Sequence, residues 1–247
     1  MAATYDDIAE QYQKTTTELL YHRYSDQETY FHALGDLSGE SILDLACGEG
    51  RFTRKLKQKG AKRVIGVDIS KEMIELAMEK ERMKPLGIEY RVRDVLELGQ
   101  IGKFNIVTAA YLLNYARTRE DLLKMCQNIF LNLKSGNRFV TINNNNEESP
   151  DSYPKIEKYG YTKSISGPIE EGVPITVTLK AEGQGEVSFD NYYLTNATYK
   201  SVFREVGFKE IIWHPVRISS EGIRKFGQEY WRDFLQNPSF VCIECVK

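Results

Sequence analysis

The chain has no dense block of lysine and arginine, and it has no apolar run long enough to cross a membrane. Across its 247 residues, 33 basic and 35 acidic side chains give a formal net charge of −2. The electrostatic footprint of a nucleic-acid-binding protein is therefore missing, and we expect no polynucleotide partner. The first residues, MAATYDDIAEQYQ, are acidic and polar rather than basic and then apolar. We expect no secretion signal, no membrane partner and a cytoplasmic location.

Cysteine and histidine are too few and too scattered for a disulfide framework or a metal site. The four cysteines are Cys47, Cys126, Cys242 and Cys245. Their wide or hydrophobic settings predict reduced, buried thiols. The C-x-x-C at the end of the chain has no second pair and no neighbouring histidine cluster. The histidines His22, His32 and His214 each stand alone. We therefore expect no bound metal.

What the sequence does have is a regular alternation of short apolar strands with segments of helical period. The alternation begins with SILDLA at Ser41 and ends with RFVTIN, which reaches Asn143. Strands that alternate with helices imply right-handed crossovers and a mainly parallel sheet covered on both faces. We therefore predict an α/β fold with a doubly wound, mostly parallel sheet.

The flanking segments have other patterns. Apolar residues recur at helical spacing from Tyr5 to Tyr12, which predicts a helical cap. The stretches ITVTLKA and EVSFDNYYL predict an antiparallel hairpin laid over the open edge of the site. A final helix, NATYKSVFREVGF, is expected with Thr195 or Asn196 as its cap, followed by two closing strands. We predict one domain with four parts: a helical cap (1–39), a cofactor-binding core (40–143), a hairpin lid (144–194) and a closing helix with strands (195–247).

The segment ILDLACGEG, which ends at Gly50, is an apolar strand that runs into a glycine-rich turn and then a helix. In a parallel sheet such a turn lies at the carboxyl ends of the strands, where ligands bind. Glycine lets a ligand approach the backbone, and the following helix offers free N–H groups. A dinucleotide turn has the form G-x-G-x-x-G, but Thr53 stands where the third glycine would follow Gly48 and Gly50. We expect a nucleotide-like ligand and disfavour a dinucleotide.

Two further strands end in a carboxylate. Asp68 can accept hydrogen bonds from both ribose hydroxyls, and its alternative role is a cap for the next helix. Ile69 and Met73 are candidates for apolar contact with an adenine ring. Asp94 ends the third strand, with Val95 beside it, and its alternative role is to cap the turn that follows.

Together these residues resemble the D-x-x-x-G-x-G motif of class I S-adenosylmethionine methyltransferases, with Ala46 in place of the usual first glycine. The resemblance implies a seven-stranded, Rossmann-like methyltransferase fold and S-adenosylmethionine as the cofactor. It places Asp44 near the methionine amino group, and Gly48 and Gly50 beside that half of the cofactor. It also implies that Asp94 receives the adenine amino group.

A narrower similarity extends over most of the chain. The opening Y-x-x-I-A-x-x-Y at Tyr5, the form D-L-A-C-G-E-G and the late Y-W-x-x-F at Tyr230 resemble the toxoflavin-synthase-like branch of small-molecule methyltransferases. In related enzymes an N-terminal tyrosine or arginine reaches back to the cofactor carboxylate. Tyr12 and Arg23 are therefore our candidates for that contact.

The acceptor side is less clearly marked. Tyr111 and Asn114 follow the fourth strand, where they would flank the methyl donor, and core packing is the alternative for Tyr111. His214 follows a late strand and is a candidate base. The run from Asn143 to Asn146 is interpreted as a solvated loop.

We predict methyl transfer from S-adenosylmethionine to a small-molecule acceptor by direct displacement at the methyl group. Alignment and desolvation can supply most of that catalysis, so neither a metal nor a covalent nucleophile is required. Two alternatives stay open: a nucleotide-binding oxidoreductase, and a non-catalytic protein that binds S-adenosylmethionine. The sequence leaves open the acceptor, its reacting atom and the oligomeric state.

Overall fold

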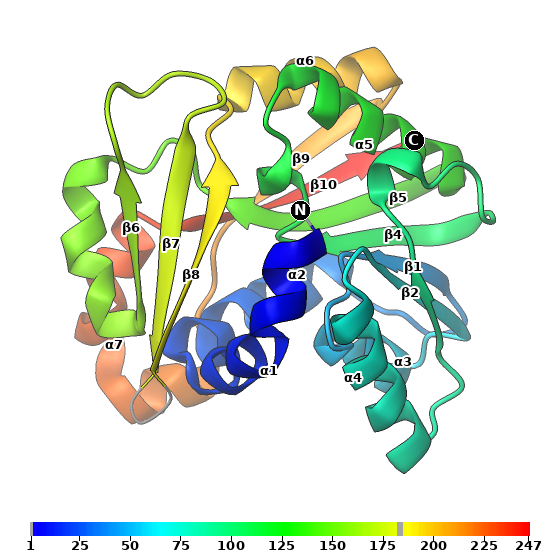
Figure 1. Cartoon of the computed structure of the whole chain (residues 1–247), viewed down its shortest axis with the longest axis horizontal. Helices are drawn as coiled ribbons and strands as arrows, with labels where there is room; N and C mark the ends of the chain where they lie inside the picture. Colours follow the sequence, from blue (N-terminus) through cyan, green and yellow to red (C-terminus); the bar gives the residue numbers. More distant parts are fainter. Residues whose placement is uncertain (1, 182–184) are drawn as a thin grey trace.

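The main sheet has seven strands in the order β3-β2-β1-β4-β5-β10-β9 in the computed structural model, which describes residues 2–181 and 185–247 (Figure 1). Its strands are β1 (Ser41–Leu45), β2 (Arg63–Asp68), β3 (Glu89–Val92), β4 (Phe104–Ala110), β5 (Leu133–Asn144), β9 (Glu210–His214) and β10 (Phe240–Val246). Strands β1 to β5 are parallel, and β10 is antiparallel to β5 and β9. The predicted mostly parallel, seven-stranded α/β fold is confirmed.

The helices around the sheet begin at well-defined caps. They are α3 (Arg51–Gln58), α4 (Lys71–Met83), α5 (Arg119–Asn132), α6 (Asn196–Val206) and α7 (Ser220–Gln236). Four of them begin at a residue whose side-chain hydroxyl accepts a hydrogen bond from the backbone N–H three residues later. These capping residues are Ser70, Thr118, Thr195 and Ser219. Thr195 is thus the cap of α6, one of the two caps that the sequence suggested.

Helix α7 corrects the prediction that α6 is the final helix. It bends at Gly227, where φ is 80° and ψ is 160°. That break interrupts the apolar period on which a sequence prediction depends. At Gly222 an added Cβ would lie 2.8 Å from the Cβ of Tyr24, so α7 packs closely against the segment that contains Tyr24.

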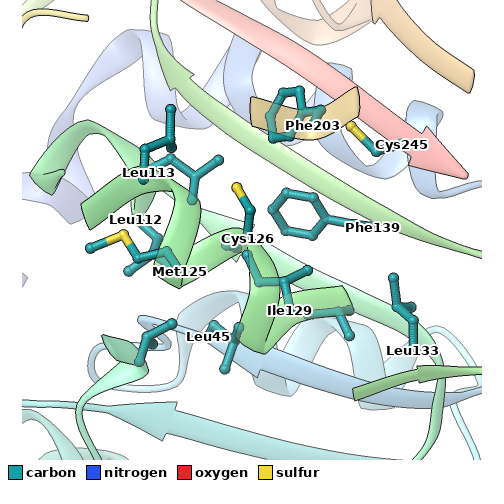
Figure 2. Close-up of a cluster of buried hydrophobic side chains, with 14 of the residues drawn as sticks. Leu45, Leu112, Leu113, Met125, Cys126, Ile129, Leu133, Phe139, Phe203 and Cys245 are labelled. Atoms are coloured by element: carbon teal, nitrogen blue, oxygen red, sulfur yellow. The ribbon is translucent and has the colours of Figure 1, made fainter. Parts of the chain in front are cut away.

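Each face of the sheet has its own core. On one face, α5 and α6 bury side chains that include Met125, Cys126 and Phe203 against the sheet (Figure 2). On the other face, α2, α3 and α7 contribute buried apolar side chains, Trp231 among them. Burial of both faces explains why the strands read as nearly continuous apolar runs in the sequence.

The four cysteines are buried free thiols, as predicted. Cys242 belongs to one core and Cys245 to the other, because residues three apart on a strand point to opposite faces. The C-x-x-C spacing therefore does not bring these two sulfurs together.

The helical cap and a second sheet lie beside the carboxyl ends of the central strands. The cap consists of α1 (Ala2–Glu18), the π-helical turn η1 (His22–Asp26) and α2 (Gln27–Leu34). The second sheet is antiparallel, with β6 (Tyr161–Ile165), β7 (Pro174–Ala181) and β8 (Gly185–Tyr192). The hairpin of β7 and β8 was predicted, whereas β6 was not. Helix α1 contacts β7, β8 and α4. The side chain of Tyr5, with which the predicted cap pattern begins, lies outside the described residues.

Three short 3₁₀ segments complete the described structure: η2 (Val95–Glu97), η3 (Leu113–Tyr115) and η4 (Pro150–Tyr159). None of the helices within residues 2–181 and 185–247 combines the length and the apolarity that a membrane crossing requires.

Candidate active site

A cavity of about 460 Å³ lies between the strand ends, the helical cap and the second sheet. That volume is within the range of about 300–1,000 Å³ typical of small-molecule sites. Nine of the residues predicted for the site line it: Tyr12, Ala46, Gly48, Asp68, Ile69, Met73, Asp94, Val95 and Tyr111. Residues predicted from four different strand ends and from the cap therefore converge on one cavity.

Asp68 holds the two turns that border the cavity. Its Oδ2 accepts the Gly48 N–H at 2.8 Å, and its Oδ1 accepts the Ser70 N–H at 2.9 Å. The side chain is buried, and that burial raises the pKa of Asp68. Ser70, not Asp68, caps α4. Each carboxylate oxygen has a second lone pair, so Asp68 keeps the capacity to accept hydrogen bonds from a ligand.

Asp94 combines the two roles that the sequence left as alternatives. Its Oδ1 accepts the Leu96 N–H at 2.8 Å and thereby caps η2, while the residue also lines the cavity. Val95 lines the cavity next to it, and Ile69 and Met73 form an apolar wall after β2. These four residues can enclose a flat heterocycle and offer it one carboxylate.

The turn after β1 needs residues in left-handed conformations. Ala46, Gly48 and Gly50 have φ values of 52°, 54° and 81°. An added Cβ on Gly50 would lie 2.5 Å from the hydroxyl oxygen of Tyr90, so only glycine fits at this position. Gly50 itself does not line the cavity. Ala46 holds a conformation that glycine adopts without strain, consistent with the glycine usual at this position in the resembling motif.

Asp44 lies beneath the turn and does not line the cavity. The Thr53 hydroxyl donates to its Oδ2 at 2.6 Å, and the Thr108 hydroxyl donates to its Oδ1 at 2.8 Å. These contacts join α3, β1 and β4 below the glycine turn. Burial raises the pKa of Asp44 to about 6, and the threonine hydroxyls oppose that shift. Asp44 thus supports the turn from below, and its predicted place near the methionine half of the cofactor stays a prediction.

A pH experiment can measure the cost of ionising Asp44. Because its folded-state pKa lies above the ordinary value of 3.8, the native state binds the proton more tightly than the unfolded chain, and stability falls as pH rises toward that pKa. We expect the wild-type free energy of unfolding to fall, relative to Asp44→Asn, by about 1–2 kcal/mol from about pH 5 to about pH 7. Urea unfolding of both proteins across that range gives the difference. A pH-independent difference would contradict the raised pKa.

Tyr111 stands where β4 leaves the sheet, in a left-handed conformation with φ of 61°. A non-glycine residue held there is strained backbone of the kind that clusters at functional sites. Its N–H donates to the Ile142 carbonyl at 2.7 Å, and its hydroxyl lies 3.4 Å from Asp26 Oδ2. The ring lines the cavity, so Tyr111 is not solely a packing residue.

Four other predicted site residues lie outside the cavity. Arg23 is exposed and pairs with Glu221, at 3.3 Å between Nη2 and Oε1. Asn114 is buried on η3 beside the cavity-lining segment, and neither amide atom has a hydrogen-bond partner. His214 Nε2 lies 2.8 Å from Glu244 Oε2 on the edge strand pair. Gly50 is the fourth of these residues outside the cavity wall. Because His214 does not line the cavity, it is not in position to act as a base on a ligand bound there.

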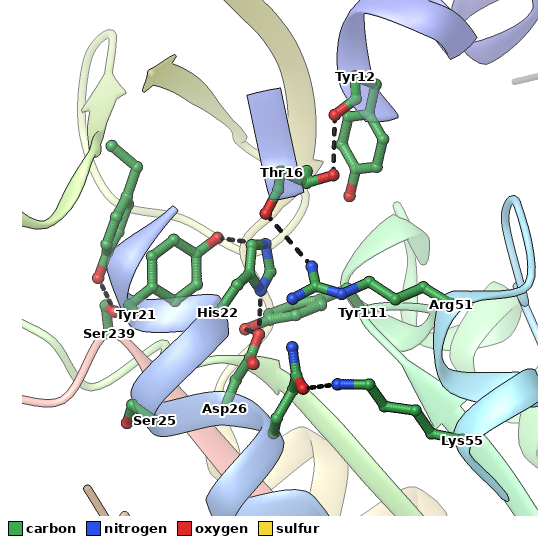
Figure 3. A network of polar contacts seen from close by, with 12 residues as sticks. Tyr12, Thr16, Tyr21, His22, Ser25, Asp26, Arg51, Lys55, Tyr111 and Ser239 are labelled. Carbon is green, nitrogen blue, oxygen red and sulfur yellow. Dashed lines mark hydrogen bonds and ion pairs between the residues drawn. The ribbon is translucent and has the colours of Figure 1, made fainter. Parts of the chain in front are cut away.

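The structure adds cavity residues that sequence reasoning missed. Tyr21 and His22 line the cavity from the cap, and His22 contacts the buried Asp26 (Figure 3). The spacing of His22 and Asp26, four residues apart in a helical segment, was a readable signal. Asn191 on β8 also lines the cavity and is almost fully buried. Its Oδ1 accepts from Asn144 Nδ2 at 2.8 Å, whereas its own Nδ2 has no hydrogen-bond partner.

The asparagine run is not the solvated loop we predicted. Asn143 and Asn144 end β5 and are buried, and Asn146 is buried as well. Their amides satisfy neighbouring groups, as when Asn143 Oδ1 accepts the Leu113 N–H at 3.1 Å. Polar composition alone therefore misled the interpretation.

As for metals, no three His, Cys, Asp or Glu side chains in the described part of the chain are grouped so that they could hold an ion.

Comparison with known proteins agrees with this geometry. Residues 42–136 match the family model described as a methyltransferase domain. Over 131 residues the chain is 37% identical to demethylmenaquinone methyltransferase of Lactococcus lactis, a match that covers 51% of this chain and 50% of that protein. Over 124 residues it is 32% identical to ubiquinone biosynthesis O-methyltransferase of Acinetobacter baylyi, covering 48% and 49% of the two chains. The chain spans about half the length of these curated relatives.

Solved structures show the same fold over nearly the whole chain. The S-adenosylmethionine-dependent methyltransferase from Mesorhizobium loti superposes with a TM-score of 0.64 at 19% identity, covering 89% of this chain and 96% of that one. A complex titled DhpI-SAM-HEP gives a TM-score of 0.65 at 19% identity, with coverage of 99% and 95%. The predicted methyltransferase-type fold is confirmed, and residues 42–136 match a methyltransferase domain, whereas the toxoflavin-synthase-like branch stays a prediction.

Proposed function

We propose that this chain, which contains a methyltransferase domain, transfers a methyl group from S-adenosylmethionine to a small-molecule acceptor. The observation that carries the proposal is the single cavity, in which residues from the strand ends face residues from the cap and the second sheet. The strand-end wall has the features of a nucleoside site, and the opposite wall is left for an acceptor.

Each strand end has a role in holding the cofactor. Asp68 accepts hydrogen bonds from the ribose hydroxyls through the lone pairs that Gly48 and Ser70 leave free. Asp94 and Val95 would hold the adenine edge, and Met73 would pack against the ring face. Ala46 and Gly48 leave room for the methionine half, since neither has a side chain beyond Cβ. S-adenosylmethionine supplies an activated methyl group at this position.

The opposite wall is rich in aromatic side chains. Phe189 and Tyr192 lie on β8, and Tyr111 and Tyr115, which follow β4, also line the cavity. Flat aromatic walls suit a planar acceptor ring, which gains area burial and ring contacts. Asn191 offers its unpartnered amide N–H₂ to an oxygen of that ring. The relatives named demethylmenaquinone methyltransferase and ubiquinone biosynthesis O-methyltransferase, each matched over about half of its length, support an oxygen-bearing ring as acceptor.

The toxoflavin-synthase-like branch is our finer proposal for the family. Tyr12, from the opening motif, lines the cavity and lies edge-on to Phe189, with 5.8 Å between ring centroids. Trp231 and Phe234, from the late motif, are fully buried in the core. Of the two outer motifs, only the opening one contributes directly to the cavity. Tyr12 lines the cavity and Arg23 does not, which favours Tyr12 as the residue that reaches the cofactor.

Calorimetry tests the proposed function. We expect S-adenosylmethionine and S-adenosylhomocysteine to bind and NAD not to bind, because the turn after β1 lacks the third glycine of a dinucleotide site. Transfer of labelled methyl groups to a panel of phenols, amines and thiols then separates an enzyme from a non-catalytic binding protein. Tight NAD binding without S-adenosylmethionine binding would overturn the proposal in favour of an oxidoreductase.

A further inference from the structure

We propose that Tyr21, His22 and Asp26 form a proton relay that deprotonates a hydroxyl group of the methyl acceptor, so that the protein is an O-methyltransferase for phenol-type acceptors. The inference deepens the proposed function and rests on it. Sequence reasoning placed the candidate base elsewhere, at His214.

The relay is built into the helical cap. His22 Nδ1 contacts Asp26 Oδ2, and the Tyr21 hydroxyl lies 3.0 Å from His22 Nε2 (Figure 3). Asp26 is fully buried, and His22 and Tyr21 are 4% and 7% exposed. The five residues from His22 to Asp26 form a π-helical turn, a feature frequent at functional sites. Both ring nitrogens of His22 therefore have defined partners in a protected setting.

The partners fix which groups carry protons. An ionised carboxylate only accepts hydrogen bonds, so we assign a proton to His22 Nδ1, which donates to Asp26. Nε2 of the neutral ring is then an acceptor, and the Tyr21 hydroxyl donates to it. Burial raises the pKa of Tyr21 well above its ordinary value, so its hydroxyl keeps its proton at neutral pH. This is the arrangement of a base whose orientation is set by a third group.

The relay opens on the cavity at one end only. Tyr21 and His22 line the cavity, whereas Asp26 does not. Asp26 lies behind them in the core, where its Oδ1 has no hydrogen-bond partner. A proton taken from a ligand in the cavity would thus move toward a buried carboxylate, which stabilises the imidazolium that forms.

Other titratable groups face the relay from several elements. The ring of Tyr161 on β6 is tilted against that of Tyr21, at 4.4 Å between centroids, and Tyr111 stands edge-on to His22 at 5.9 Å. Their hydroxyls stay protonated because burial raises both pKa values. Tyr12 on α1 and the cations Arg51 and Lys55 on α3 complete these surroundings.

The chemistry needs such a relay only for certain acceptors. A neutral amine or a thiolate attacks a methyl group without prior loss of a proton, whereas a hydroxyl is a weak nucleophile until its proton leaves. The acceptor's O–H bond breaks as its proton passes to the Tyr21 oxygen, and the Tyr21 proton passes to His22 Nε2. The acceptor oxygen forms the new bond to the methyl carbon, and the electron pair of the broken C–S bond stays on sulfur. The proton on His22 is finally released to water.

The first test uses 4-nitrophenol without any cofactor, because its phenolate has a visible absorbance. We expect the pH midpoint of ionisation of the bound phenol to lie about one unit or more below that of the free phenol, a tenfold or larger shift. His22→Gln keeps hydrogen-bonding groups toward Tyr21 and Asp26 but cannot take the proton, so the shift should be lost. His32→Ala, an exposed histidine in the same cap, is the matched control and should keep it. An unshifted midpoint in the wild type overturns the relay, as does failure to bind the phenol.

The second test is methyl transfer to 4-methylphenol and to 4-nitrophenol. At neutral pH, His22→Ala and His22→Gln should lower kcat for the weakly acidic 4-methylphenol by about 10²–10⁴-fold. The loss should be much smaller for 4-nitrophenol, which ionises by itself, and should shrink for both as pH rises. Equal losses for the two phenols, no loss in a folded His22→Gln protein, or transfer to amines and thiols alone would overturn the proposal. S-adenosylmethionine calorimetry on each variant reports separately on the proposed function.

Discussion

Asp68→Ala should weaken S-adenosylmethionine binding on the order of a hundredfold or more. Two hydrogen bonds from the ribose to a charged acceptor contribute roughly 1.5–3 kcal/mol each, and a factor of ten in Kd corresponds to about 1.4 kcal/mol. The variant also leaves the Gly48 and Ser70 N–H groups without the acceptor that holds the turn. Calorimetry gives the change in Kd, and urea unfolding gives the change in stability.

Two further variants separate ribose recognition from support of the turn. Asp68→Asn keeps one oxygen acceptor and removes the charge, so it should fold and still bind at least about tenfold more weakly, because hydrogen bonds to charged groups are the stronger ones. Glu89→Ala removes an exposed carboxylate at the opposite end of the neighbouring strand β3 and should leave Kd unchanged. Normal binding by Asp68→Ala would mean that the carboxylate serves the turn alone.

Glu148→Ala should lower the free energy of unfolding by about 3–5 kcal/mol, because it leaves a buried ammonium without its counter-charge. Glu148 Oε2 lies 2.7 Å from Lys163 Nζ, and these side chains are 0% and 3% exposed. Lys163 also donates to the Ser239 carbonyl at 2.9 Å, just before β10. Burial lowers the pKa of Lys163, which the carboxylate opposes. The pair joins β6 of the second sheet to the main sheet.

A surface pair with the same geometry is the control for this variant. Lys158 Nζ and Asp233 Oδ2 are also 2.7 Å apart, but their side chains are 39% and 48% exposed. Asp233→Ala should therefore cost no more than about 1 kcal/mol. Replacing both Glu148 and Lys163 with methionine should recover most of the loss, since an apolar pair needs no counter-charge. Urea unfolding of the wild type, the two single variants and the double methionine variant gives the four free energies of unfolding. Equal losses of stability in Glu148→Ala and Asp233→Ala would contradict the predicted effect of burial.

The sequence predicted the parts of the fold that local patterns encode. Strands buried on both faces are apolar runs, and helices begin at hydroxyl caps such as Thr195, so their order could be read along the chain. Because parallel strands end at one edge of a sheet, Asp68 and Asp94 could be assigned to one site before any contact was known. Helix α7 escaped because Gly227 breaks its period, and β6 escaped because the buried Lys163 interrupts the apolar alternation between Tyr161 and Ile165.

The acceptor side could not be predicted in the same way, because its residues come from elements that meet only in three dimensions. The spacing of His22 and Asp26 could be read, but their surroundings form only when the fold brings Tyr111 and Tyr161 beside the cap. Arg23 was chosen from the same helical segment, but consecutive helical residues point about 100° apart. Its neighbour His22 faces the cavity, whereas Arg23 is exposed and pairs with Glu221.

The strand order has a consequence for how the molecule assembles. Strands β1 to β5 come from one continuous segment, whereas β10 reaches its place beside β5 from almost one hundred residues further along, and β9 joins the sheet only through β10 (Figure 1). Strands β1 to β5 can therefore pair within one continuous segment, while closure of the sheet waits for a distant strand, which slows folding. Until β10 arrives, β5 presents an unpaired edge that can pair with another chain. Dilute refolding conditions should accordingly favour recovery of the native protein over aggregation.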